Sequence, residues 1–175
     1  MMRMILGWVL AAVAMFLVGF GFYATPLSET AVSKASDATG AQIQAALRGL
    51  PRDGFYAIPN PLTAADAAGM LTGPTAFVHV RLAGRPVFDP MTLAKGFAHY
   101  LLVAALLGAV LGGVQRGARS GVAFGMAGVA VLFIHFGGPI WWSYNWQTAA
   151  FFAVADFTSL AVGGLVMTWW LRRRA

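Results

Sequence analysis

The chain has 175 residues, of which 59% are hydrophobic and 10% are charged, and its formal net charge is +6. Soluble domains carry about a quarter charged residues, so this composition excludes an ordinary water-soluble fold and indicates a membrane protein. The absence of cysteine excludes disulfides, thiolate nucleophiles and cysteine-ligated metals. The excess positive charge lies in short stretches beside apolar runs, which favours a role in membrane topology over nucleic-acid binding.

The first apolar run covers residues 4–23 and is about as long as the roughly 20 residues that a helix needs to cross a bilayer. Arg3 precedes it, as in a secretory signal peptide. Its apolar stretch is longer than the usual ~7–15 residues of such a signal, and no clean A-x-A cleavage site closes it. An uncleaved helix is therefore the preferred interpretation.

Residues 25–92 form a segment with frequent prolines and a more polar composition. A short helix is predicted within residues 39–51, with Thr39 as its candidate cap and Gly49 and Pro51 as its stop, and another helical turn or two after Thr63. Residues 54–59 and 75–82 are rich in β-branched and aromatic side chains and are predicted as strands. The segment is therefore expected to form a small α+β cap that leans on the membrane helices or on a partner.

Three further apolar runs cover residues 93–114, 120–136 and 148–171, and the third run of the chain can extend into Gly137 and Gly138. The predicted fold class is therefore an all-α membrane protein, a four-helix transmembrane bundle with a small α+β insert between its first two spans.

Arginines mark one side of the predicted membrane. They precede the first run, fill the loop between the second and third runs at Arg116 and Arg119, and close the chain after the fourth. Loop 137–147 has no charge, and the charges of residues 25–92 sum to zero. The positive-inside rule then places both termini in the cytoplasm.

Aromatic residues gather at both predicted membrane interfaces, where amphipathic rings are favoured. The belt consists of Trp141, Trp142, Tyr144, Trp146, Trp169 and Trp170. The outer loop that carries the first four could also bind a lipid headgroup, a quinone ring or a neighbouring subunit.

Small residues offer candidate contacts between helices. Glycines separated by four residues let helix backbones approach closely in lipid. The candidates are Gly121, Gly125, Gly128 and Gly163. Packing inside this chain is preferred, and a face for dimerisation or for a partner is the alternative.

Asp156 lies inside the fourth run, where a carboxylate is costly and therefore a candidate functional group. At helical spacing it shares a face with Ala149, Ala153 and Gly163, so it is predicted to point toward other helices.

Histidines are the candidate companions of Asp156. His99 lies in the second run and His135 at the end of the third, so a bundle would bring both to a depth similar to that of Asp156. His79, in the segment before the second run, could approach the same group. Two histidines and a carboxylate suit a metal ion such as zinc or iron, two facing histidines suit haem, and a carboxylate with a histidine suits proton transfer.

A structural role for Asp156 is the alternative, and it is preferred over these uses. The partners would then be Lys95, His99, Ser159, Thr158 or Tyr100. The sequence contains no H-E-x-x-H, G-x-S-x-G or P-loop motif.

The layout of one span, an outer segment and three further spans resembles that of small bacterial inner-membrane proteins without an assigned activity. The outer segment contains GFYAIP at residues 54–59 and GPTAFVHV at residues 73–80. This resemblance implies a bacterial inner-membrane location and no particular ligand.

The function expected from the sequence is that of a non-enzymatic subunit or oligomer, which acts through helix packing and its outer cap. Its expected partners are the lipid bilayer and a membrane protein or a second copy, and not nucleic acid. The alternative is a metal-, haem- or proton-handling protein that uses His99, His135 and Asp156.

Overall fold

The computed structural model describes residues 2–63, 69–70 and 72–173. They form two compact units. The first unit combines the chain up to Ser33 with the chain from Asp89 onward, and the second covers Lys34–Phe88. The structure is mostly helical, with four long apolar helices in the first unit and a two-stranded sheet in the second.

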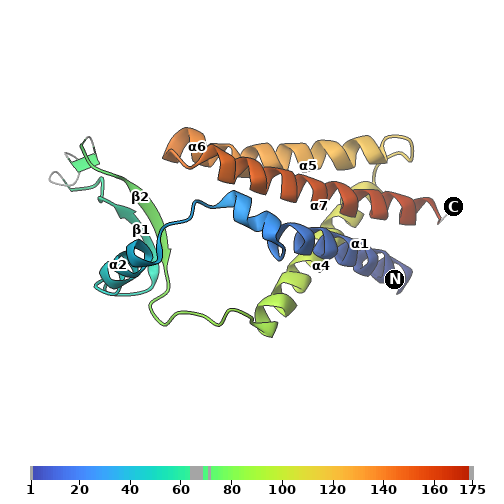
Figure 1. Cartoon of the computed structure of the whole chain (residues 1–175). Coiled ribbons are helices and arrows are strands. Elements are labelled where there is room, and N and C mark those ends of the chain that lie inside the picture. The colour runs from blue at the N-terminus through green and yellow to red at the C-terminus, as the bar shows by residue number, and fades with distance from the viewer. Residues whose placement is uncertain (1, 64–68, 71, 174–175) are drawn as a thin grey trace. The chain divides into compact units, whose positions relative to one another are not determined.

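Helix α7 (Trp146–Arg172) is the centre of the first unit, because it contacts each of the other three long helices. Helices α1 (Met2–Tyr23) and α5 (Arg119–His135) lie on either side of it (Figure 1). Helix α4 (Pro90–Gly112) packs against α1 and α7. The indole Nε1 of Trp170 donates to the carbonyl of Arg3 at 2.8 Å, which joins the end of α7 to the start of α1.

All four long helices are long and apolar enough to cross a membrane, as expected for a multi-pass membrane protein. The third candidate span is Arg119–Trp142, because the short helix α6 (Gly137–Trp142) follows α5 almost directly. The helical path therefore runs on through Gly137 and Gly138.

Small side chains form much of the core where the four helices meet. The core cluster consists of Ala11, Ala12, Met15, Ala104, Leu107, Leu111, Ala123, Met167 and Leu171. Alanine allows close approach of helix backbones, which is how helices associate in lipid. Larger apolar side chains such as Leu17, Leu102 and Phe133 are exposed instead, as suits helices surrounded by hydrocarbon.

Polar caps fix the starts of two long helices. The Asp89 carboxylate accepts from the backbone N–H of Met91 at 3.0 Å, and Pro90 begins α4. The side-chain oxygen of Asn145 accepts from the N–H of Thr148 at 3.0 Å at the start of α7. Each cap satisfies a backbone donor that has no partner within its helix.

A 3₁₀ helix, η1 (Pro26–Ala31), holds the chain against α7 after the end of α1. The hydroxyl of Thr148 donates to the carbonyl of Ala31 at 2.5 Å, and the amide of Gln147 donates to the carbonyl of Thr30 at 2.8 Å.

The second unit contains helix α2 (Asp37–Leu47) and a two-stranded antiparallel sheet. The cap of α2 is Ser36, whose hydroxyl accepts from the N–H of Thr39 at 3.2 Å. The prediction that Thr39 caps this helix is therefore wrong. Ser36 lies three residues earlier, so the helix gains most of another turn.

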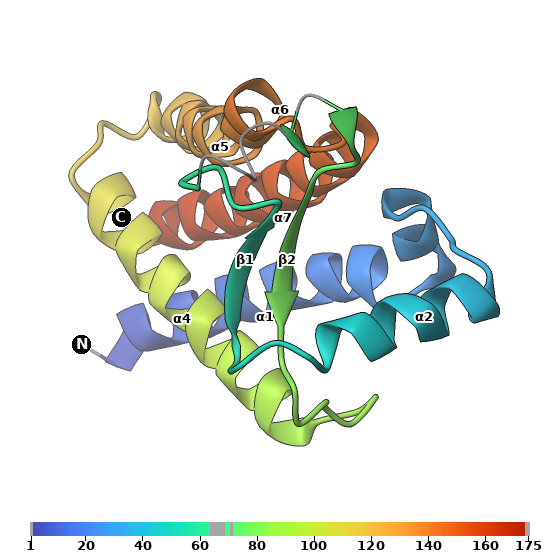
Figure 2. The ribbon, with the colours of Figure 1, turned by 90° about the vertical axis from the view of Figure 1, so that its left-hand side faces the viewer.

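Strands β1 (Gly54–Ile58) and β2 (Ala76–Val80) pair from Gly54 opposite Val80 to Ile58 opposite Ala76 (Figure 2). The rings of Phe55 and Phe77 stack with their centroids 5.8 Å apart, which strengthens one face of the pair. The helical turn predicted after Thr63 falls largely on residues 64–68 and 71, outside the described residues.

Candidate functional site

Asp156 lies on α7, on the side that packs against other helices. Ala149, Ala153 and Gly163, which share its helical face, are all buried. Small neighbours bring the adjoining helices close, so groups at the ends of α1 and α5 come within reach of a short side chain on α7.

Two side chains from two other helices bind the Asp156 carboxylate. The hydroxyl of Tyr23, the last residue of α1, donates to Oδ1 at 2.9 Å. The Nε2 atom of His135, the last residue of α5, lies 2.7 Å from Oδ2. We call these three residues the Tyr23–Asp156–His135 network. It joins α1, α5 and α7 through one carboxylate.

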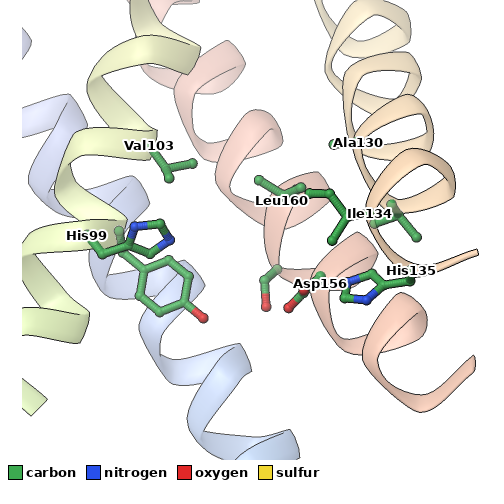
Figure 3. A pocket seen from close by; sticks show the side chains of 10 residues that line it. His99, Val103, Ala130, Ile134, His135, Asp156 and Leu160 are labelled. Carbon is green, nitrogen blue, oxygen red and sulfur yellow. Dashed lines mark hydrogen bonds and ion pairs between the residues drawn. The ribbon is translucent and has the colours of Figure 1, made fainter. Parts of the chain in front are cut away.

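A pocket of about 310 Å³ adjoins this network. It is lined by α4, α5 and α7, and its residues are His99, Tyr100, Val103, Ala130, Val131, Ile134, His135, Asp156, Ser159 and Leu160. Figure 3 shows His135 beside Asp156 on one side of the pocket and His99 on the other. Its volume falls at the lower end of the range for small-molecule sites, about 300–1,000 Å³.

The predicted site of His99, His135 and Asp156 is therefore only partly assembled. His135 contacts Asp156, whereas His99 lines the same pocket from the opposite side. Within the described part of the chain, no group of three His, Cys, Asp or Glu side chains is placed to hold a metal ion. These three residues therefore do not form the metal site that was one of the alternatives, because His99 lies on the opposite wall of the pocket.

His79 belongs to β2 in the second unit. Its ring lies 4.7 Å from that of Phe55 between centroids, directly across the strand pair. This contact explains the position of His79 by sheet packing alone.

Tyr23 is the member of the network that the sequence analysis missed. The proposed partners Thr158 and Ser159 donate instead to the carbonyls of Val154 and Ala155, one turn earlier on α7. Such bonds are usual for hydroxyls within a helix. The sequence did contain a signal for Tyr23. It lies at the end of the first apolar run, close to the membrane depth predicted for His135.

The four candidate glycines divide into two kinds. A Cβ atom at Gly163 would lie 2.5 Å from Sδ of Met15, so this glycine permits contact between α1 and α7. A Cβ atom at Gly121, Gly125 or Gly128 would meet no described atom within 4 Å. The expected packing inside the chain is therefore not found at these three α5 positions.

The aromatic residues predicted as belts lie at opposite ends of the long helices. Trp169 and Trp170 are in the last turns of α7, where the Arg173 guanidinium lies 3.9 Å from the ring centre of Trp169. Trp141 and Trp142 end α6, and Trp146 begins α7 and contacts Phe136. Tyr144 lies between these helices, and its ring packs over Gly138.

Comparison of this chain with protein-family models, with curated proteins and with solved structures gives no match.

Proposed function

We propose that this chain is a multi-pass membrane protein that exchanges protons between the aqueous surface and its internal pocket. The observation that carries this proposal is the Tyr23–Asp156–His135 network, three titratable side chains joined by two short hydrogen bonds, of which His135 and Asp156 line the pocket. Titratable groups within a membrane-spanning helix are costly, and there they commonly mark a proton or ligand pathway.

The chemistry of the three groups supports proton exchange. A phenol, a carboxylate and an imidazole can each donate or accept a proton, and imidazole does so near neutral pH. Tyr23 is the last residue of α1 and His135 is the last residue of α5, and each is joined directly to the Asp156 carboxylate. A proton taken up at either residue has only one hydrogen bond to cross before it reaches the carboxylate.

Metal binding is less well supported, because no group of three His, Cys, Asp or Glu side chains among the described residues is placed to hold a metal ion. Proton exchange needs only the two hydrogen bonds that Asp156 already forms with Tyr23 and His135.

We further propose that the protein lies in the bacterial inner membrane with both termini in the cytoplasm. Arg3, Arg116, Arg172 and Arg173 all belong to the end of the helices opposite the Tyr23–Asp156–His135 network. The positive-inside rule assigns that end to the cytoplasm. Under this topology the network opens toward the outer side.

Infrared difference spectroscopy of the protein in lipid nanodiscs tests the proton-exchange proposal. Subtracting the spectrum of Asp156→Asn from that of the unmodified protein isolates the carboxyl signal of Asp156. We expect this signal to change when the bulk pH is stepped. In Tyr23→Phe, which keeps the ring and loses the hydroxyl, we expect the change to persist and to become slower.

Asp37→Asn provides the matched control, because Asp37 is an exposed carboxylate in the second unit. Its signal should follow bulk pH at the same rate with and without the Tyr23 hydroxyl. An Asp156 signal that does not change with bulk pH would show that the network only holds the helices together. It would rule out the proton-exchange proposal.

A second candidate function is that of a subunit or oligomer, acting through helix packing and its outer cap. The observation that favours it is the open glycine face of α5, formed by Gly121, Gly125 and Gly128. By contrast, a Cβ atom at Gly108, Gly163 or Gly164 would lie within 3 Å of another helix. Glycines that do not pack against a helix of their own chain can allow a helix of another chain to approach closely.

Native mass spectrometry in mild detergent tests this second candidate. Gly121→Leu and Gly125→Leu are expected to reduce association with a second copy or a co-purifying membrane protein. Gly21→Leu is the matched control, because Gly21 also has open space beside it but lies on α1. A protein that is monomeric and alone throughout, or an assembly that all three variants retain, would count against the subunit function.

A further inference from the structure

The pocket beside the network has polar groups on two opposite walls and apolar groups between them. His99 and Tyr100 of α4 supply one polar wall, and His135 and Asp156 supply the other. The remainder is mostly apolar, and the Ser159 hydroxyl there donates to the carbonyl of Ala155; the apolar residues are Val103, Ala130, Val131, Ile134 and Leu160. A matching ligand therefore has apolar faces and polar atoms at opposite edges.

The pocket also reaches the apolar outer surface of the helices. Ile134 lines it and is nevertheless 65% exposed. His99 is exposed as well, next to the exposed side chain of Leu102 one turn further along α4. In a membrane this surface would face lipid, where an imidazole without a polar partner is costly. A ligand that enters from the bilayer and offers His99 an oxygen atom would relieve that cost.

We propose that this pocket binds the ring of a lipid-soluble quinone or its quinol. This proposal rests on the proton-exchange function and names the ligand class that the site would take. A para-quinone is a planar, apolar ring with oxygen atoms at opposite edges, and its hydrocarbon tail would remain in the bilayer. One oxygen would meet the α4 wall and the other the wall formed by α5 and α7.

The pairing of His135 with Asp156 suits both forms of such a ligand. When the carboxylate accepts from Nε2–H, a neutral imidazole keeps a lone pair on Nδ1, which can accept a hydrogen bond from a quinol hydroxyl. When the imidazole takes up a proton, Nδ1–H can donate to a quinone carbonyl, and the carboxylate stabilises the positive charge. His135 can therefore bind the quinol when its imidazole is neutral and the quinone when its imidazole is protonated.

Two ligands that differ only in their oxygen atoms provide the test. Menadione has two ring carbonyls, and 2-methylnaphthalene has the same fused rings and methyl group without them. Binding of each is measured by equilibrium dialysis of the detergent-purified protein, with protein-free micelles subtracted. We expect one menadione per chain, bound more tightly than 2-methylnaphthalene.

Variants locate the binding site. His99→Phe keeps a ring and removes the hydrogen-bonding nitrogens, so menadione should bind about 3- to 10-fold more weakly while 2-methylnaphthalene binding is unchanged. His79→Phe makes the same change in the second unit and should leave both affinities unaltered. Ala130→Phe fills the pocket from α5 and should remove binding of both ligands, independently of any hydrogen bond.

Three results would overturn the inference: no menadione binding, equal affinity for the two ligands, or unchanged menadione binding in both His99→Phe and Ala130→Phe. The infrared measurement on Asp156 is made without ligand, so the two proposals fail separately. A pH-responsive Asp156 without menadione binding would leave proton exchange standing. If menadione binds selectively and the Asp156 signal does not respond to pH, the ligand proposal would stand and the proton-exchange proposal would fail.

Discussion

At the scale of single residues, Asp156 shows how a carboxylate can be accommodated among apolar helices. Its two oxygens meet a phenol from α1 and an imidazole from α5, so both have a polar partner that bulk water would otherwise supply. An unpaired carboxylate there would oppose helix association. The same two bonds link Asp156 to the last residue of α1 and the last residue of α5.

Removing the Tyr23 hydroxyl should therefore lower stability as well as slow proton exchange. We expect Tyr23→Phe to reduce the free energy of unfolding by about 1.5–3 kcal/mol, the usual range for a hydrogen bond to a charged group. The measurement is reversible unfolding in mixed micelles, followed by circular dichroism. In an Asp156→Leu background the same substitution should cost almost nothing, because the acceptor is gone. Equal costs in both backgrounds would show that the bond contributes nothing.

Asp89 predicts a local response to acid. The Thr92 hydroxyl donates to its carboxylate at 2.7 Å and, together with the backbone N–H of Met91, holds the pKa of Asp89 below its ordinary value. A carboxyl group whose pKa is lowered on folding stabilises the folded state above its ordinary pKa, and this contribution is lost as the pH falls through the lowered value. The first turn of α4 should thus fray below about pH 4.

Hydrogen exchange of the Met91 and Thr92 amides, followed by mass spectrometry, would detect this fraying. The exchange is measured between pH 3 and 6, in pH steps of about one unit. After correction for intrinsic exchange rates, protection should fall with acid in the unmodified protein. In Asp89→Asn, which still caps but does not titrate, protection should stay constant over the same range. Acid-induced loss of protection in this variant would assign the effect to another group.

At the scale of helices and strands, length and composition carry most of the information that a sequence provides. The runs 4–23, 93–114, 120–136 and 148–171 correspond to α1, α4, α5 and α7, because a bilayer requires long uninterrupted apolar stretches. Local signals were less decisive. Ser36 and Thr39 are both good caps, and only the hydrogen bond formed shows which one begins α2.

The residues that meet between helices could not be predicted in the same way. Period and spacing place Asp156 on the packed face of α7, but they do not determine which end residue of α1 or α5 reaches it. Glycine marked a candidate contact on both α5 and α7, although among these positions only the α7 glycines would meet another described helix of this chain. Contacts of this kind depend on the relative rotation of the helices, which the sequence of one helix does not contain.

The two kinds of glycine give a matched pair of variants. A Cβ atom at Gly164 would lie 2.6 Å from Cβ of Ala123, so Gly164→Ala forces α5 and α7 apart. We expect a loss of about 1–3 kcal/mol in the free energy of unfolding, as for other overpacked interfaces. Gly125→Ala adds the same methyl group where no described atom lies within 4 Å, and it should leave the stability of the monomer unchanged or slightly raised. Equal effects of the two changes would contradict the observed α5–α7 contact.

At the scale of the whole molecule, charge and helix direction are consistent with one arrangement in a membrane. The arginines near the start of α1 and the end of α7 lie together, as the bond from Trp170 to the Arg3 carbonyl requires. The α4–α5 connection, with Arg116, belongs to the same end because each of these helices spans the unit once. Positive charge therefore gathers at one end, and the Tyr23–Asp156–His135 network lies toward the other.

Single cysteines can test this arrangement, because the natural chain has none. Ala118→Cys probes the α4–α5 connection, Ser143→Cys the connection between α6 and α7, and Thr75→Cys the second unit; all three positions are exposed. In right-side-out spheroplasts a membrane-impermeant maleimide should label Cys at positions 75 and 143 and spare position 118, whereas lysed membranes should be labelled at all three. Labelling of position 118 before lysis, with protection of 143, would invert the topology. The network would then open to the cytoplasm, and the proton exchange proposed here would draw on cytoplasmic rather than external protons.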